Sequence, residues 1–295
     1  MPVREKDKPI GVFDSGVGGL SVLRALTRKL PGESFVYFGD TARVPYGDLS
    51  PEEVCRYTVE IGEWLLDRGC EMIVIACNTA TVMGMAALRR VTEAPVLGMV
   101  EAAVDAVLND SGDEDDADAG GAHRRGVGIW PLGLIATQGT LDSGVYQSAF
   151  AERAPGKPLY TQACPDFTAL VEVGRTEGPD VDRAINIYLT GLTEKKIRTL
   201  VLGCTHYPFL APALSAFMGE GVKLVDPALR LASMAGERLA RNRTANIGAI
   251  EAADTGENPG AVEFWCSGDT AEFKAVGGIL LGRPVDVVKR KAFGS

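Results

Sequence analysis

The sequence has few histidines, few cysteines and no long hydrophobic segment. Its six cysteines among 295 residues include no Cys-X-X-Cys pair. Because zinc sites and disulfide-bonded scaffolds usually show that spacing or a higher cysteine density, we expect reduced thiols and no metal site. No apolar run approaches the roughly 20 residues of a membrane span, and residues 1–8 lack the apolar centre of a signal peptide. The expected location is the cytoplasm, without a membrane partner.

Basic residues are also scarce relative to acidic ones. The chain has 30 Lys and Arg against 39 Asp and Glu, a formal net charge of −9. No basic stripe with interleaved aromatic residues is present, so we expect no nucleic-acid partner and favour a small-molecule substrate. A block of acidic residues lies in a segment from about 109 to 125 that has no hydrophobic periodicity. We interpret this segment as a solvated surface insertion without a chemical role.

Two of the cysteines occupy matching positions 127 residues apart. Cys77 follows the apolar run 73–76, and Cys204 follows the apolar run 200–203. Ligands of open α/β sheets bind at the C-terminal ends of the strands, so both thiols are placed for chemistry rather than for packing. The alternative is that both are small buried hydrophobic residues, as most free cysteines are. Two opposed thiols indicate a two-base proton-transfer enzyme.

The similarity around the cysteines extends upstream and indicates an internal repeat. Residues 72–75 align with residues 199–202, and residues 11–16 align with residues 133–138. Short apolar runs alternate with helical patterns along nearly the whole chain, which is typical of an α/β protein. One local example is Ser50, where an N-cap serine precedes a proline and two glutamates and predicts a helix that runs to about residue 67.

These patterns predict two similar three-layer α/β domains with mostly parallel sheets, related by a pseudo-two-fold axis. The first domain would comprise residues 1–99 plus about 227–295 and carry Cys77. The second would comprise residues 100–226 and carry Cys204. Because equivalent strand ends would then face each other, we expect the active site in the cleft between the domains.

Polar residues surround both candidate thiols. Asn78 and Thr79 follow the first cysteine, and Thr205 and His206 follow the second. Hydroxyl, amide and backbone N–H donors at the start of a helix suit a carboxylate ligand. The imidazole beside a thiol can lower its pKa or relay its proton, although a hydrogen-bonded core histidine is the alternative.

The turn at residues 14–19 follows a strand and is rich in glycine, which imitates a dinucleotide-binding fingerprint. The spacing of the glycines does not match that fingerprint, and Asp14 would place a carboxylate where the pyrophosphate of a dinucleotide should lie. Asp14 and Ser15 therefore suit contact with an ammonium group or assistance to a nearby thiol, unless the aspartate only caps a turn.

Five ordered motifs together resemble the glutamate racemases of the aspartate/glutamate racemase superfamily. They occupy residues 10–21, 37–42, 44–47, 75–80 and 202–208. The resemblance implies a cofactor-independent interconversion of L- and D-glutamate that supplies D-glutamate for peptidoglycan, with glutamate as the ligand. The resemblance leaves open whether the protein assembles as a homodimer.

The same resemblance assigns roles to individual residues. Cys77 would take the α-proton from D-glutamate with help from Asp14, and Cys204 would take it from L-glutamate. Glu172 and His206 would assist Cys204. The positions that match the family's substrate-binding residues are Asp14, Ser15, Pro45, Tyr46, Gly47, Asn78, Thr79, Thr137, Thr140, Thr205 and His206.

The motif that contains Glu172 departs from the family's usual pattern at two positions. Asp166 and Thr168 stand where family members usually carry apolar residues. The catalytic motifs themselves are intact.

Three other interpretations stay open. A related racemase acting on aspartate or a hydantoin would share the two-cysteine frame. A Cys-His hydrolase would need one nucleophile, so the second cysteine and the repeat would be unexplained. A non-catalytic ligand-binding protein can also be built from paired α/β domains, and racemisation in buffer free of metal and pyridoxal phosphate would exclude it.

Overall fold

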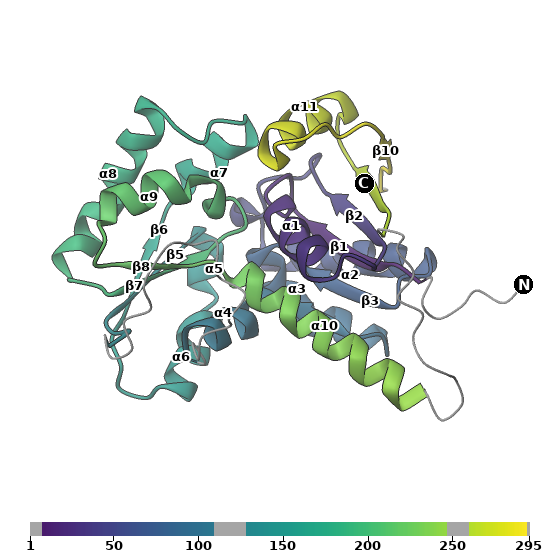
Figure 1. Ribbon diagram of the computed structural model, residues 1–295, viewed down its shortest axis with the longest axis horizontal. Helices are drawn as coiled ribbons and strands as arrows, with labels where there is room; N and C mark the ends of the chain where they lie inside the picture. Colours follow the sequence, from purple (N-terminus) through teal and green to yellow (C-terminus); the bar gives the residue numbers. More distant parts are fainter. Residues whose placement is uncertain (1–7, 109–127, 247–259, 294–295) are drawn as a thin grey trace, which may run out of the picture.

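Two parallel β-sheets, one of six strands and one of four, form the framework of the molecule (Figure 1). The computed structural model describes residues 8–108, 128–246 and 260–293. The acidic segment at about 109–125, which we interpret as a surface insertion, lies outside the described residues. Every strand pairing in both sheets is parallel, which agrees with the predicted α/β class.

The six-stranded sheet has the order β10-β9-β2-β1-β3-β4. Its strands are β1 (Ile10–Asp14), β2 (Phe35–Gly39), β3 (Met72–Ile75), β4 (Val96–Gly98), β9 (Val262–Cys266) and β10 (Val288–Arg290). All residues of the central strands β1, β2 and β3 are buried. Strands covered on both faces read as nearly continuous apolar runs, which explains why the sequence identified them.

The four-stranded sheet has the order β6-β5-β7-β8. Its strands are β5 (Leu132–Ala136), β6 (Leu159–Ala163), β7 (Thr199–Gly203) and β8 (Lys223–Val225). This order repeats the order β2-β1-β3-β4 of the larger sheet, with β5 equivalent to β1 and β7 equivalent to β3. The predicted internal repeat is therefore confirmed, and Cys77 and Cys204 follow equivalent strands.

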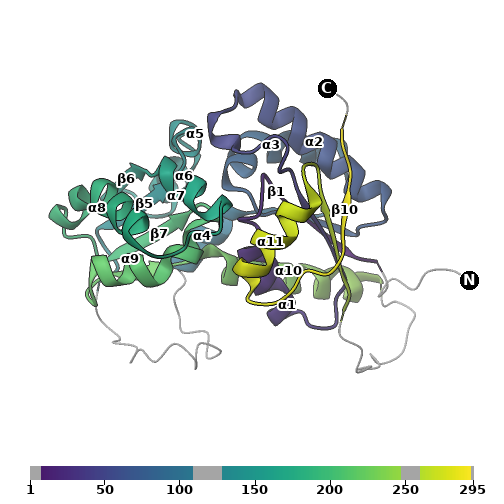
Figure 2. The ribbon, with the colours of Figure 1, turned by 90° about the horizontal axis from the view of Figure 1, so that it is seen from above.

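Helices cover both faces of each sheet (Figure 2). They are α1 (Leu20–Lys29), α2 (Pro51–Asp67), α3 (Asn78–Val91), α4 (Met99–Leu108), α5 (Gln138–Asp142), α6 (Val145–Arg153), α7 (Pro165–Glu172), α8 (Pro179–Glu194), α9 (Ala211–Met218), α10 (Pro227–Asn246) and α11 (Thr270–Leu281). Short 3₁₀ helices occupy Tyr46–Asp48 and Tyr207–Leu210. Helix α2 begins with the predicted N-cap, where Ser50 and Glu53 form a reciprocal capping box.

Three apolar clusters hold these layers together. In the larger sheet, helices α2 and α3 bury one face with Phe13 and Ile75, and helices α1, α10 and α11 bury the other face with Val12 and Tyr37. In the smaller sheet, α4 and α6 pack against Leu134, and α7, α8 and α9 cover the opposite face. Both halves are therefore three-layer structures, as predicted.

The chain passes between the two sheets twice, from β4 into α4 and from β8 into α10. Helix α10 packs along α1 and α4, so it touches elements beside both sheets. We keep the division into residues 1–99 plus 227–295 and residues 100–226 as a proposal. Its support is that strands β1 to β4, β9 and β10 form one sheet and strands β5 to β8 form the other.

Candidate active site

The candidate site lies where the C-terminal ends of the two sheets meet. Asp14 ends β1, and Cys77 lies between β3 and α3. Thr137 and Cys204 follow the equivalent strands β5 and β7 of the smaller sheet. The loops after these strands are in direct contact across the two halves, since the Thr205 hydroxyl donates a hydrogen bond of 3.1 Å to Asp14 Oδ1. Strand ends of this kind are where open α/β sheets bind their ligands.

Cys77 is a nearly inaccessible thiol at the N-cap of α3, with 5% of its surface exposed. Its Sγ accepts a hydrogen bond of 3.4 Å from the Ala80 backbone N–H and lies 3.7 Å from Ser15 Oγ. Burial raises the pKa of this thiol to about 12, and the negative charge of Asp14 adds to the increase. At neutral pH, Cys77 is therefore a proton donor rather than a thiolate.

Cys204 has a different set of partners, although it is equally inaccessible, with 6% of its surface exposed. Its Sγ lies 3.4 Å from His206 Nδ1, and His206 Nε2 lies 2.6 Å from Glu172 Oε1. Burial of the imidazole acts to lower the pKa of His206, but Cys204 and Glu172 together raise it well above its ordinary value. A cationic imidazole beside a thiol favours the thiolate form.

Asp14 connects the two halves of the site and is completely buried. Its Oδ2 accepts a hydrogen bond of 3.0 Å from the Gly16 backbone N–H. Burial raises the pKa of Asp14, although the nearby charge of His206 opposes the increase. The carboxyl group thus lies within electrostatic range of both thiol systems, since it acts on Cys77 and responds to His206.

The glycines after β1 leave room for the opposite half of the molecule. A Cβ atom at Gly16 would lie 2.2 Å from Glu172 Oε1, and one at Gly18 would lie 2.5 Å from His206 Nδ1. The Glu172 carboxylate also accepts a hydrogen bond of 3.1 Å from the Val17 backbone N–H. The glycine-rich turn is therefore a close-approach surface between the halves and not a phosphate cradle.

A group of three hydroxyls lies where α3 meets the smaller sheet. Thr79, Thr137 and Thr140 have Oγ1 atoms separated by 2.9 to 3.1 Å from one another. A Cβ atom at Gly47 would approach Thr137 Cβ to 2.9 Å, so the loop before α2 packs against the same group. Hydroxyls can rotate to donate, so this group can bind a carboxylate.

Asn78 offers an unused donor in the same region. Its Oδ1 accepts a hydrogen bond of 2.5 Å from the Tyr146 hydroxyl. Its Nδ2 is buried and has no hydrogen-bond partner within the described parts of the chain. Since buried donors are nearly always satisfied, this amide suits an acceptor on a bound ligand.

The loop that contains Pro45, Tyr46 and Gly47 is anchored by its tyrosine. The Tyr46 ring is buried and its hydroxyl donates to the Asp40 carboxylate, which also forms an ion pair of 2.7 Å with Arg43. Pro45 is exposed. Because the Tyr46 hydroxyl is already bonded, its ring and the loop backbone are the groups left to face a ligand.

Some residues at the site were not predicted from the sequence. Tyr146 holds Asn78, and Ser21 Oγ donates a hydrogen bond of 2.9 Å to the Thr205 carbonyl. Thr168 Oγ1 lies 3.8 Å from Cys204 Sγ. The sequence singled out Thr168 only as a departure from a motif, and Tyr146 and Ser21 carry no local signal.

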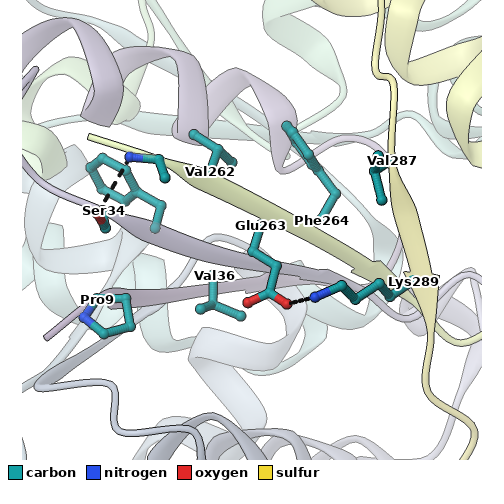
Figure 3. A pocket seen from close by; sticks show the side chains of 10 residues that line it. Pro9, Ser34, Val36, Val262, Glu263, Phe264, Val287 and Lys289 are labelled. Carbon is teal, nitrogen blue, oxygen red and sulfur yellow. Dashed lines mark hydrogen bonds and ion pairs between the residues drawn. The ribbon is translucent and has the colours of Figure 1, made fainter. Parts of the chain in front are cut away.

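The structure also has a cavity that is not part of this site. A cavity of about 360 Å³ lies near the N-terminal ends of β2 and β9, where Val36, Glu263 and Lys289 are among the lining residues (Figure 3). That end of the sheet is opposite to Asp14 and Cys77. Within the described residues, no group of three or more His, Cys, Asp or Glu side chains could hold a metal ion, and no helix is long and apolar enough to cross a membrane.

Comparisons with known proteins agree with this arrangement. A family model described as Asp/Glu/Hydantoin racemase matches residues 10–235. A glutamate racemase from Beutenbergia cavernae is 41% identical over 283 residues, which cover 96% of this chain and 92% of that protein. The structure of a glutamate racemase isoform from Bacillus anthracis matches with a TM-score of 0.82 at 30% identity, covering 98% of both chains. A glutamate racemase from Francisella tularensis, in complex with D-glutamate, matches with a TM-score of 0.81 at 29% identity and the same coverage. The chain therefore belongs to the Asp/Glu/hydantoin racemase family and, within it, to the glutamate racemases.

Proposed function

We propose that this protein is an isomerase that interconverts L- and D-glutamate by proton transfer between two thiols, Cys77 and Cys204, without a cofactor. The observation that carries the proposal is the pair of buried thiols at equivalent strand ends of the two sheets, where a hydrogen bond from Thr205 to Asp14 joins the two halves. Each thiol has its own partners, which suits one base and one acid in the same reaction.

The chemistry requires the protein to stabilise a carbanion. The α-proton of an amino acid is weakly acidic because the adjacent carboxylate is a poor electron sink. Hydrogen-bond donors aimed at that carboxylate stabilise the charge that develops as the carbon loses its proton, and a closed site strengthens those bonds. The unpartnered amide of Asn78 and the hydroxyls of Thr79, Thr137 and Thr140 are the donors we assign to the substrate's carboxylates.

In the direction from L- to D-glutamate, the Cys204 thiolate takes the α-proton and becomes a thiol. The Cys77 thiol then gives its proton to the opposite face of the carbon and becomes a thiolate. The reverse direction uses the same groups in exchanged roles. His206, held by Glu172, stabilises the Cys204 thiolate, and Asp14 holds the proton on Cys77 between turnovers.

The remaining polar residues position the substrate. Asp14 and Ser15 offer acceptors for the substrate's ammonium group, and Thr205 holds the Asp14 carboxylate from the opposite half. The backbone of the Pro45-Tyr46-Gly47 loop closes one side of the site. The glutamate racemase from Francisella tularensis was crystallised with D-glutamate, which supports glutamate as the ligand here.

The biological setting follows from this activity. D-Glutamate is a component of peptidoglycan, so we place the enzyme in cell-wall biosynthesis and in the cytoplasm, where the precursor is made. Neither a nucleic acid nor a membrane is expected as a partner. A homodimer is the assembly that we would test first, by light scattering on the purified protein.

The decisive experiment combines chiral analysis with heavy water. Purified protein, treated with a chelator and free of pyridoxal phosphate, should racemise L-glutamate, and Cys77→Ala or Cys204→Ala should abolish the reaction. In heavy water, the product enantiomer should carry deuterium while recovered substrate stays largely protonated at early times. Equal early labelling of substrate and product would indicate a single shared base and would refute the two-thiol mechanism.

L-Aspartate separates this proposal from an aspartate-specific relative. The shorter side chain cannot reach the second set of carboxylate donors unless its α-carbon moves off the line between the thiols. A misplacement on the order of 1 Å can cost about 100-fold in rate. Equal turnover of aspartate and glutamate in the same chiral assay would contradict the assigned substrate.

A further inference from the structure

Thr168 provides a hydroxyl group next to one of the two thiols. Its side chain is buried on α7, and its Oγ1 lies 3.8 Å from Cys204 Sγ, within hydrogen-bonding range for sulfur. A threonine in a helix usually bonds the carbonyl four residues earlier. Here that carbonyl, on Cys164, already accepts a hydrogen bond of 2.9 Å from the Tyr207 hydroxyl. The partners of the Thr168 hydroxyl are instead the Cys204 sulfur and the Tyr207 oxygen.

The position of Thr168 is fixed by its neighbours. Phe167 packs edge-to-face against Tyr207 and Tyr188, with ring centroids 5.3 and 5.6 Å apart. The Tyr188 hydroxyl donates a hydrogen bond of 2.8 Å to Asp166. Both polar residues that depart from the family motif therefore have defined partners, and α7 is anchored on each side of the threonine.

Two acceptors compete for the single hydroxyl proton of Thr168. One is the Cys204 sulfur, and the other is the Tyr207 phenol oxygen, to which Thr168 also hydrogen-bonds. A thiolate attracts a hydroxyl donor more strongly than a neutral phenol does, because a charged acceptor makes the stronger bond. When Cys204 is a neutral thiol, this advantage is lost and the hydroxyl is free to turn to Tyr207.

We propose that Thr168 is a positioning residue that gives the Cys204 thiolate a second hydrogen-bond donor besides His206 and thereby assists proton transfer on the Cys204 face only. The proposal rests on the proposed two-thiol function. The other thiol has a different neighbour, since the Cys77 thiol donates a hydrogen bond of 3.7 Å to Ser15 Oγ. A donor that bonds the charged sulfur more strongly than the neutral one stabilises the thiolate form of Cys204 selectively.

The test uses Thr168→Val, which removes the hydroxyl at similar volume, and Thr168→Ser, which keeps it. Because the two enantiomers are equally stable in water, kcat/KM must be the same in both directions for every variant. Loss of the hydroxyl should lower it about 3- to 10-fold in both directions, and Thr168→Ser should restore it. Thr199→Val is the matched control, because Thr199 is a buried threonine of the same half at the start of β7, and it should behave as wild type.

Substrate isotope effects locate the change on one face. L-Glutamate deuterated at the α-carbon reports on transfer to Cys204, and deuterated D-glutamate reports on transfer to Cys77. In Thr168→Val the isotope effect on kcat/KM should rise for the L-substrate and fall for the D-substrate, because only the Cys204 barrier is higher. Isotope effects that stay at wild-type values, or that change in the same direction, would overturn the proposal.

Alkylation provides a readout that does not depend on turnover. At pH 7, peptide mass spectrometry should show iodoacetamide labelling of Cys204 slowed about 3- to 10-fold in Thr168→Val, with labelling of Cys77 unchanged. Equal slowing at both cysteines would indicate a general structural effect and would overturn the proposal.

Failure of the proposed function gives a different result. If the wild-type protein does not racemise glutamate, or if Cys204→Ala still does, the proposed function is refuted, and this result is seen before any Thr168 variant is measured.

Discussion

The Tyr146 hydroxyl on α6 donates a hydrogen bond of 2.5 Å to the side-chain oxygen of Asn78, the first residue of α3. Both side chains are buried, at 0% and 3% exposure, and they come from elements beside different sheets. This bond fixes the amide orientation, so the unpartnered Nδ2 is held ready for a ligand. A tyrosine of the opposite half thus prepares the substrate-binding surface.

Tyr146→Phe should weaken substrate binding more than it slows the chemistry. Without the hydroxyl, the Asn78 amide can rotate, and a fixed donor to the substrate becomes a mobile one. We expect KM to rise about tenfold, equivalent to about 1.4 kcal/mol, with a smaller change in kcat. Tyr160→Phe removes a tyrosine hydroxyl near the N-terminal end of β6, in the same half but away from the site, and should leave both constants unchanged. A fall in kcat at constant KM would contradict the positioning role.

Asp14→Asn should make Cys77 more reactive while making the enzyme less active. In the wild type, burial and the Asp14 charge raise the pKa of Cys77 to about 12. Its alkylation rate should therefore increase about tenfold per pH unit from pH 7 to 9, with no plateau. Removing the negative charge lowers this pKa, so the thiolate fraction and the alkylation rate at each pH should increase several-fold. Racemisation should fall at least about tenfold.

Quantitative peptide mass spectrometry of Cys77 over that pH range measures the effect. Asp67→Asn, at an exposed helix end, is the control and should match the wild-type rate at every pH. A plateau below pH 9 in the wild type, or slower alkylation in Asp14→Asn, would show that the charge of Asp14 does not act on this thiol.

Glu172→Gln should shift the pH dependence of activity. Glu172 contributes to the raised pKa of His206, after the larger effect of Cys204, so the neutral amide lowers that pKa. The imidazolium is then lost at lower pH, and the alkaline decline of kcat/KM should move to lower pH, so that the variant falls further below the wild type as the pH rises. Glu177→Gln, an exposed residue of the same half, should keep the wild-type profile. An unshifted profile would contradict the assigned charge state.

Gly16→Ala should inactivate the enzyme without unfolding it. The added Cβ would lie 2.2 Å from Glu172 Oε1, so the Glu172 carboxylate must move from its place beside His206. We expect at least about a 100-fold loss in kcat/KM, with the melting temperature nearly unchanged. Gly191→Ala on exposed α8 meets open space and should raise stability by about 0.5 to 1 kcal/mol with full activity. Full activity of Gly16→Ala would show that this close approach is unnecessary.

The sequence predicted those parts of the molecule that short segments specify. Buried parallel strands are continuous apolar runs, so the ends of β3 and β7, and with them Cys77 and Cys204, could be located directly. The capping box at Ser50 is equally local. The repeat then indicated that equivalent strand ends would lie near each other.

Contacts between distant segments could not be predicted in this way. Nothing near Tyr146 in the sequence indicates that its hydroxyl reaches Asn78, and nothing near Thr168 indicates that it contacts Cys204. Such pairs arise only when the two sheets are placed together. The pairing of β9 and β10 beside β2 was not predicted for a related reason, although residues 227–295 were assigned to the first domain. The order of strands in a sheet depends on contacts between distant segments.

The late position of β9 in the chain has a consequence for how the protein is made. Strands β5 to β8 are contiguous in sequence, so their sheet can be completed soon after synthesis passes α10. The edge of β2 stays unpaired until β9 emerges, and unpaired edges are prone to pair with other chains. A nascent chain that ends before β9 therefore carries one finished sheet beside an unfinished, aggregation-prone one. Strand β9 therefore pairs with, and protects, an edge of β2 that was synthesised much earlier.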